Sequence, residues 1–405
     1  MSAKNIIKAI ARPLKSQVLG IVKERRVRAL EKNLLLIKNE NSFSVYETLK
    51  LASIYVESLR IKDGSYGRYL YKRNSRKPIL YASIFAVLFR HLTGTLYEIS
   101  SADKQEWIKY IQDHQSSDGL FRDPLVQNEI AETEDWWGWR HLTMLALMAL
   151  TALGAKPKYK LQFLEKLDTA DKIYSFIEKL NWAERASFTS NTLQNYGVFL
   201  QYSRDFLGEE HLKDAVSALL DGITEKVDPE TGLWGSGLSS ANAALSEGVQ
   251  AGYHFWLLFW YEKQKIPYAR QAFKSISLLQ NSYGAFNLDN DFASACQDID
   301  AIHPIAKLCV DFPDLQLSGS EILLKSLPWI VSNFNEDGGA SFQRHSCFRY
   351  GHDLMATGRN ESSIFATWFR VLSIGFLMQV LPSNDSRKTE FHFLHCPGLQ
   401  FPINY

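Results

Sequence analysis

The chain has 405 residues, of which 46% are hydrophobic and 22% are charged, with 45 Lys and Arg against 44 Asp and Glu. The net charge of +1 argues against a nucleic-acid partner, because such proteins carry a basic excess, and the hydrophobic fraction excludes intrinsic disorder. Four cysteines without CxxC spacing are too few for a disulfide scaffold, so a reducing compartment, the cytoplasm, is expected. No apolar run reaches the roughly 18–20 residues that span a bilayer.

The first 41 residues form a separate basic segment. Residues 1–32 hold nine Lys or Arg and two Glu, and the apolar positions between them recur near helical spacing. A basic amphipathic helix of this kind can lie on an anionic membrane surface, or it can pack on the fold with a solvated basic face. The sequence therefore predicts either a peripheral membrane contact through 1–32 or a surface helix.

A turn pattern recurs along the chain at a spacing of roughly 55 residues. It places a polar residue four positions before a glycine and an aromatic residue shortly after it. The copies are RIKDGSY at 60–66, QSSDGLF at 115–121, DPETGLW at 228–234, QNSYGAF at 280–286 and a looser NEDGGASF at 335–342. A degenerate copy, NWAERASF at 181–188, fills the wide gap, so six units are expected between about 42 and 382.

Each unit contains two helical stretches, one on either side of its turn. The first stretch of several units is amphipathic and the second is apolar nearly all round, so the second helices are expected to be buried. The predicted pairs are 44–60 with 78–95, 102–114 with 136–153, 160–178 with 186–204, 209–225 with 240–263, 267–280 with 296–311, and 317–334 with 359–381. No strand-period alternation is evident.

Six outer and six inner helices predict an all-α fold, an (α/α)6 toroid that forms one domain over 42–405. A linear solenoid of helix pairs is the structural alternative. Closure is favoured because helices as apolar as the inner ones need neighbours on both sides. The N-termini of the inner helices would then gather at one mouth of the ring, where free N–H groups and helix dipoles favour carboxylates and anions.

The fifth inner stretch begins CQDIDAIHPI and places Asp298, Asp300 and His303 close together near a helix start, shortly after Asp289 and Asp291. Asp at such a position often only caps the helix. The three residues together point to function, and we predict them to be catalytic.

Other helix starts supply candidate substrate-binding residues. The run ETEDWWGWRH combines carboxylates with tryptophans, and the fourth and sixth units add further polar and aromatic side chains. The candidates are Glu134, Asp135, Trp136, Trp139, Glu247, Tyr253, His254, Arg344, Glu361, Trp368 and Arg370. His254 is also compatible with a buried structural role, and Cys296, Asp298 and Cys347 with a histidine could form a zinc site of unspecific spacing.

The 13% aromatic content divides between two expected roles. The turn aromatics Phe121, Trp234, Phe286 and Phe342 are expected to staple neighbouring helix pairs. Aromatic residues of the inner helices are expected to wall a cavity. This second set comprises Trp136, Trp139, Tyr253, Phe255, Trp256 and Trp368.

The turns QSSDGLF and QNSYGAF resemble the QW motifs of the squalene–hopene cyclase and terpenoid cyclase superfamily, whose members, like the protein prenyltransferase β subunits, are α/α toroids. DIDA at 298–301 resembles the DxDD motif of class II cyclases, with Ala301 in place of the last Asp. The resemblance implies that Asp300 donates a proton and that Asp298 supports it. Neither a DDxxD magnesium motif nor the prenyltransferase zinc pattern is present, so no cofactor is expected, with Mg²⁺ only for a diphosphate substrate.

Two functions follow from these observations. The first is a class II terpenoid-cyclase-like enzyme that protonates an isoprenoid or another lipid-linked small molecule near a membrane. The alternative is a carbohydrate-active toroid, either a glycan hydrolase or lyase with Asp135 and Asp300 as its carboxylates, or a lipid-linked glycan binder; the chain is similar to bacterial toroid proteins associated with surface-polysaccharide genes. A closed apolar cavity would favour the first, and an open groove lined by Trp and polar groups the second.

Overall fold

The computed structural model describes residues 44–238, 242–288, 292–381 and 390–404, and residues Val45–Tyr405 form one compact unit. Within the described part of the chain, twelve α-helices follow one another in six pairs. Their bounds are α2 (Val45–Ser58), α3 (Leu80–Leu92), α4 (Ser101–Gln112), α5 (Trp139–Ala152), α6 (Ala170–Ile177), α7 (Ala186–Leu207), α8 (Lys213–Thr224), α9 (Asn242–Tyr261), α10 (Ala269–Leu278), α11 (Ala295–Asp311), α12 (Gln316–Val331) and α13 (Ile364–Val380).

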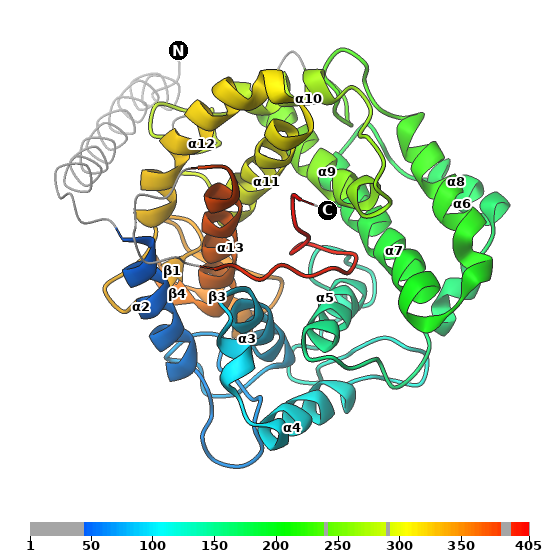
Figure 1. Cartoon of the computed structure of the whole chain (residues 1–405). Helices are drawn as coiled ribbons and strands as arrows, with labels where there is room; N and C mark the ends of the chain where they lie inside the picture. The colour runs from blue at the N-terminus through cyan, green and yellow to red at the C-terminus, as the bar shows by residue number, and fades with distance from the viewer. Residues whose placement is uncertain (1–43, 239–241, 289–291, 382–389, 405) are drawn as a thin grey trace, which may run out of the picture. The chain divides into compact units, whose positions relative to one another are not determined.

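The six second helices of the pairs form a closed inner ring. Each of α3, α5, α7, α9, α11 and α13 contacts the next one, and α13 contacts α3 (Figure 1). The helices α2, α4, α6, α8, α10 and α12 lie outside this ring. The contact between the last and the first inner helix confirms the α/α toroid and rules out a linear solenoid.

Burial explains the division into inner and outer helices. Twelve of the 13 residues of α3 and 14 of the 17 residues of α13 are buried, which matches their nearly uniform apolar sequences. The predicted pairs coincide with the observed ones apart from their ends. The largest difference is the outer helix of the third pair, which begins at Ala170 after a separate 3-10 turn at Gln162–Lys166. The side chain of Thr169 accepts a hydrogen bond from the Lys172 N–H and so caps its start.

The glycines of the turns allow each unit to pack closely on the next. Five turns are closed by an antiparallel bridge, such as Gln115 with Phe121 and Gln280 with Phe286. Gly284 has φ +92°, and a Cβ there would lie 2.7 Å from the carbonyl carbon of Lys325 in α12. The turn of the last unit meets the first unit in the same way, which closes the ring. The degenerate copy at 181–188 has no such bridge among the described residues.

Glutamine side chains of the turns, rather than the aromatic residues, bond to the neighbouring unit. Gln115 donates to the Tyr159 carbonyl at 2.9 Å and accepts from the Tyr159 N–H at 2.8 Å. Trp234 instead packs on Phe255 of its own pair, with ring centroids 4.9 Å apart, and donates to the carbonyl of Ile223. The expectation that the turn aromatics staple neighbouring pairs is therefore corrected for Trp234, which ties α8 to α9.

Four strands of two residues each accompany the last turn. β1 (Ala340–Ser341) pairs antiparallel with β4 (Ser362–Ser363), and β2 (Phe348–Arg349) pairs antiparallel with β3 (Ala356–Thr357). Strands this short leave no periodic signal in a sequence, so the sequence does not predict them.

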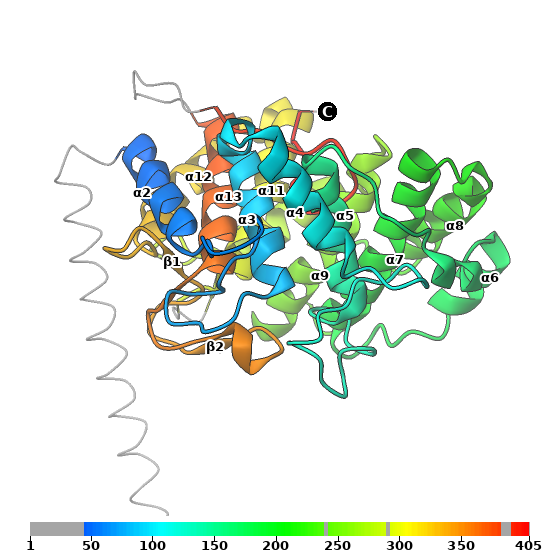
Figure 2. The ribbon, with the colours of Figure 1, turned by 90° about the horizontal axis from the view of Figure 1, so that it is seen from below.

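The C-terminal segment 390–404 enters the ring from the end opposite to β2 (Figure 2). The His392 N–H donates to the carbonyl of Leu92, the last residue of α3. Deeper in the ring, Gln400 is fully buried and accepts a 2.9 Å hydrogen bond from the indole of Trp368. The segment therefore plugs the ring at the carboxyl ends of its inner helices.

Among the described residues, no helix combines the length and the hydropathy that crossing a bilayer requires. The basic segment predicted at 1–41 lies outside the described residues.

Candidate functional site

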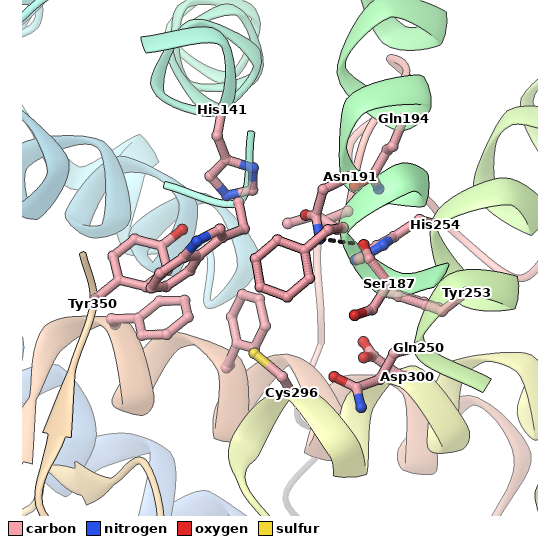
Figure 3. Close-up of a pocket in the computed structure, with 15 residues that line it drawn as sticks. His141, Ser187, Asn191, Gln194, Gln250, Tyr253, His254, Cys296, Asp300 and Tyr350 are labelled. Atoms are coloured by element: carbon pink, nitrogen blue, oxygen red, sulfur yellow. Dashed lines mark hydrogen bonds between the residues drawn. The ribbon is translucent and has the colours of Figure 1, made fainter. Parts of the chain in front are cut away.

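A pocket of about 200 Å³ lies at the amino ends of the inner helices, at the mouth where the sequence predicts a site (Figure 3). It is open to solvent on one side, since Trp136, Phe188 and Asn191 are only partly buried. The pocket is lined by Trp136, His141, Ser187, Phe188, Asn191, Gln194, Gln250, Tyr253, His254, Cys296, Asp300, Tyr350, Phe365, Phe369 and Leu399. Leu399 belongs to the C-terminal plug, which therefore contributes to the pocket wall.

Asp300 is the carboxyl group of this pocket within the described residues. It lies in the second turn of α11 and is 4% exposed, and its oxygens have no hydrogen-bond partner in the described part of the chain. Burial, reinforced by the nearby charge of Asp298, holds the pKa of Asp300 well above the usual range. A carboxyl with a raised pKa keeps its proton to a higher pH than an ordinary aspartate does, which suits it to donate a proton.

Asp298 lies in the first turn of α11, two residues before Asp300, and does not line the pocket. It forms a fully buried ion pair with Arg370 of α13 and accepts a 2.7 Å hydrogen bond from the indole of Trp329 in α12. It also accepts from the Phe286 N–H in the preceding turn at 3.2 Å. Thr143 binds the corresponding turn of another unit in the same way, through the Phe121 N–H at 2.8 Å. Asp298 thus joins three elements of the ring and acts on Asp300 only through its charge.

The histidines of the region are held neutral. Burial lowers the pKa of His254 to about 3, and its Nδ1 lies 2.8 Å from the hydroxyl of Ser190. Burial also lowers the pKa of His303 well below the usual range. His303 stacks on Phe376 and has its Nδ1 3.3 Å from the hydroxyl of Tyr253, so it reaches the pocket only through that tyrosine.

Helix α7 supplies side chains that the sequence reasoning missed. Ser187, Asn191 and Gln194 come from its first turns and lie across the pocket from Tyr350 (Figure 3), and Phe188 of the same helix also lines the pocket. Gln194 is fully buried, and neither atom of its amide has a hydrogen-bond partner in the structure. One sequence signal could have indicated them. Helix α7 carries more polar residues than expected of a buried inner helix, and it begins within the degenerate turn copy at 181–188.

His141 of α5 and Gln250 of α9 also line the pocket, although neither was predicted as a site residue. The Nδ1 of His141 is buried without a partner, and burial lowers the pKa of this histidine to about 4. A neutral imidazole with a free nitrogen is able to accept or donate one hydrogen bond, depending on its tautomer.

Of the predicted substrate-binding residues, Trp136, Tyr253 and His254 line the pocket. Asp135 does not, because its carboxylate binds Arg140 at 2.5 Å and Thr192 at 2.7 Å. The expected acid–base pair of Asp135 with Asp300 is therefore not assembled in this pocket.

Six other predicted residues do not line the pocket; five of them bond to other parts of the protein, and one is buried. Glu247 accepts from the hydroxyl of Ser187, a lining residue, at 2.7 Å. Glu361 pairs with Lys72 at 2.7 Å. Arg344 donates to the carbonyls of Ser332 and Phe334, and Trp368 donates to Gln400. Trp139 is only 2% exposed, and Arg370 is paired with Asp298. The side chain of Glu134 is partly buried and also lies outside the pocket lining.

No group of three or more His, Cys, Asp or Glu that could hold a metal ion is found in the part of the chain that the structure describes. The zinc site drawn from Cys296, Asp298 and Cys347 is thus not assembled there. Cys296 lines the pocket as a free thiol.

Comparison with known proteins gives neither a family model nor a curated protein that matches the chain. Solved structures with a similar arrangement include a family 88 glycosyl hydrolase from Bacteroides vulgatus, at 12% sequence identity and a TM-score of 0.48. The match covers 83% of this chain and 99% of the hydrolase chain. A polysaccharide lyase matches at 10% identity and TM-score 0.45, covering 84% and 99%. A possible member of family GH105 from Klebsiella pneumoniae subsp. pneumoniae MGH 78578 matches at 12% and 0.42, covering 84% and 96%.

The expectation of an isoprenoid cyclase is corrected by the pocket. The pocket lacks the closed apolar wall that a carbocation needs, because it opens to solvent and presents amides such as Asn191, Gln194 and Gln250. Water and polar groups at such a wall would quench a cationic intermediate.

Proposed function

We propose that the chain is a carbohydrate-active enzyme that binds a sugar unit in the pocket at the amino ends of the inner helices. In this proposal Asp300 acts as the general acid. The observation that supports it is a buried carboxyl with a raised pKa on the wall of a solvent-accessible pocket that combines aromatic rings with amides.

The wall chemistry suits a sugar ring. One side of the pocket is aromatic, with Tyr350 packed between Phe365 at 4.6 Å and Trp136 at 5.7 Å between ring centroids. The opposite side is formed by α7, whose Asn191 and Gln194 carry amides. Apolar faces of a sugar can lie on the rings while its hydroxyl groups exchange hydrogen bonds with the amides, and a ligand pocket characteristically combines these two kinds of surface.

The chemistry follows from the protonation states. Asp300 transfers its proton to the glycosidic oxygen as the bond from that oxygen to the sugar carbon breaks. A water molecule then adds to the sugar carbon and returns a proton to the carboxylate of Asp300, so the group is restored and the atoms balance. The free nitrogen of His141, whose imidazole is neutral, is available to orient that water.

The test compares Asp300→Asn with Asp314→Asn in the full chain. Asp314 is exposed and pairs with Arg270 outside the pocket, so its substitution is a matched control. Both variants and the parent protein are incubated with end-labelled oligosaccharides of different sugars, and the products are separated. Asp300→Asn is expected to lose at least about a hundredfold in turnover while it still binds the substrate, since it keeps the shape but not the acid.

Two results would refute the proposal. One is turnover by Asp300→Asn at the parent rate. The other is the absence of binding to every oligosaccharide, measured by the fluorescence of the chain with Trp136→Phe as a reference for the pocket signal.

A further inference from the structure

The pocket carries no cationic side chain among the residues that line it. Two arginines of the inner helices are already neutralised: Arg370 is fully buried against Asp298, and Arg140 binds Asp135. Arg185 at the start of α7 is exposed, with its guanidinium 3.6 Å from the ring centroid of Phe188, and it is not part of the lining.

The amino ends of α11 and α13 do not supply a substitute positive site, because each is closed by a side-chain cap. The first turn of α11 is closed by a capping box, in which Ser294 accepts from the Gln297 N–H at 3.2 Å and Gln297 accepts from the Ser294 N–H at 2.9 Å. Ser363 accepts from the Ala366 N–H and closes α13 in the same way. These N–H groups are therefore committed within the protein and are not offered to an anion.

The amide of Gln194 indicates which chemical group of a ligand the pocket can bind. It is fully buried and lines the pocket, and both its Nε2 and its Oε1 have no partner. A ligand hydroxyl group can accept a hydrogen bond from the Nε2 of Gln194 and donate one to its Oε1. An ionised carboxylate has only acceptors, so it would leave the Oε1 of Gln194 unsatisfied, and a buried polar atom without a partner is costly.

We propose that this pocket selects an uncharged sugar unit and discriminates against the corresponding uronate, with Gln194 recognising the hydroxyl groups of the sugar. This inference rests on the proposed carbohydrate function. Burying a carboxylate without a cation costs several kcal/mol, which exceeds what one hydrogen bond returns. Leu399 of the plug closes part of the wall, and the volume of about 200 Å³ is below the roughly 300–1,000 Å³ of most ligand pockets, which suits one small unit.

The test uses the full chain and pairs of oligosaccharides that share length and linkage but differ in charge: gluco- with glucurono-, galacto- with galacturono-, and manno- with mannurono-oligosaccharides. Affinity is measured by calorimetry at neutral pH. In at least one pair the neutral member should bind at least tenfold more tightly than its uronate. Gln194→Glu should weaken the neutral member at least tenfold, and Arg270→Gln, a control outside the pocket, should leave the ratio unchanged.

A second variant guards against a Gln194 substitution that does not fold. Asn191 lies half-exposed on the same wall, so Asn191→Arg places a cation in the pocket, and it should raise the affinity for uronates. Equal or tighter binding of the uronates by the parent protein would overturn this inference and leave the carbohydrate function standing. Binding of neither member in any pair, by a protein whose thermal melt shows that it is folded, would overturn both.

Discussion

Closure of the ring depends on a glycine in the last turn, which makes Gly338→Ala a direct test of the fold. Gly338 has φ +84°, and a Cβ there would lie 2.7 Å from the carbonyl carbon of Leu51 in α2, the first helix of the ring. Alanine at this position pays about 1–2 kcal/mol for its left-handed backbone, and a further 1–3 kcal/mol or so for displacing a packed neighbour. We expect Gly338→Ala to lower the free energy of unfolding by about 2–5 kcal/mol.

Two matched variants separate the contact from the backbone conformation. Gly208 has φ +77°, and no neighbouring atom lies within 4 Å of the position that a Cβ would take there, so Gly208→Ala should cost only the backbone contribution of about 1–2 kcal/mol. Gly284→Ala makes the equivalent contact between two consecutive units and should cost as much as Gly338→Ala. The measurement is urea unfolding followed by circular dichroism. If Gly338→Ala cost no more than Gly208→Ala, the first and last units would not be in contact, and the ring would be open.

Other consequences concern the buried charges, the histidines and the plug. Arg370→Leu should lower the free energy of unfolding by about 3–5 kcal/mol, because it leaves Asp298 buried without its cation, and the double variant with Asp298→Asn should recover much of this loss in urea unfolding. Burial lowers the pKa of His141 to about 4, so its contribution to stability is present above about pH 6.5 and is lost as pH falls toward 4. When the free energy of unfolding is measured against pH in this range, its slope should be about 1.4 kcal/mol per pH unit smaller in His141→Gln than in the parent protein. Removal of 390–405 should lower the melting temperature and expose the indole of Trp368, seen as a red shift of fluorescence, whereas an unchanged spectrum would contradict the placement of the plug.

The fold could be predicted from the sequence because its signals are local and repeated. Glycine turns at a regular spacing and helices that are apolar all round specify six similar units, and each signal is visible within one unit. The site was predicted only in part. Trp136 and Asp300, which line the pocket, lie near helix starts at the expected mouth, and Tyr253 and His254 lie in the middle of an inner helix, whereas Gln194 lies in a unit whose turn is degenerate.

The sequence by itself determined the helix pairs, their order and the end of the ring at which polar side chains gather. Only the tertiary structure decided how neighbouring residues divide their roles. Asp298 and Asp300 are two positions apart on α11, yet one faces Arg370 and the other faces the pocket. The reason is physical. The charge and the pKa of a carboxyl group depend on which partners and how much water surround it, and the partners of Asp298 come from α12 and α13, which are distant in sequence.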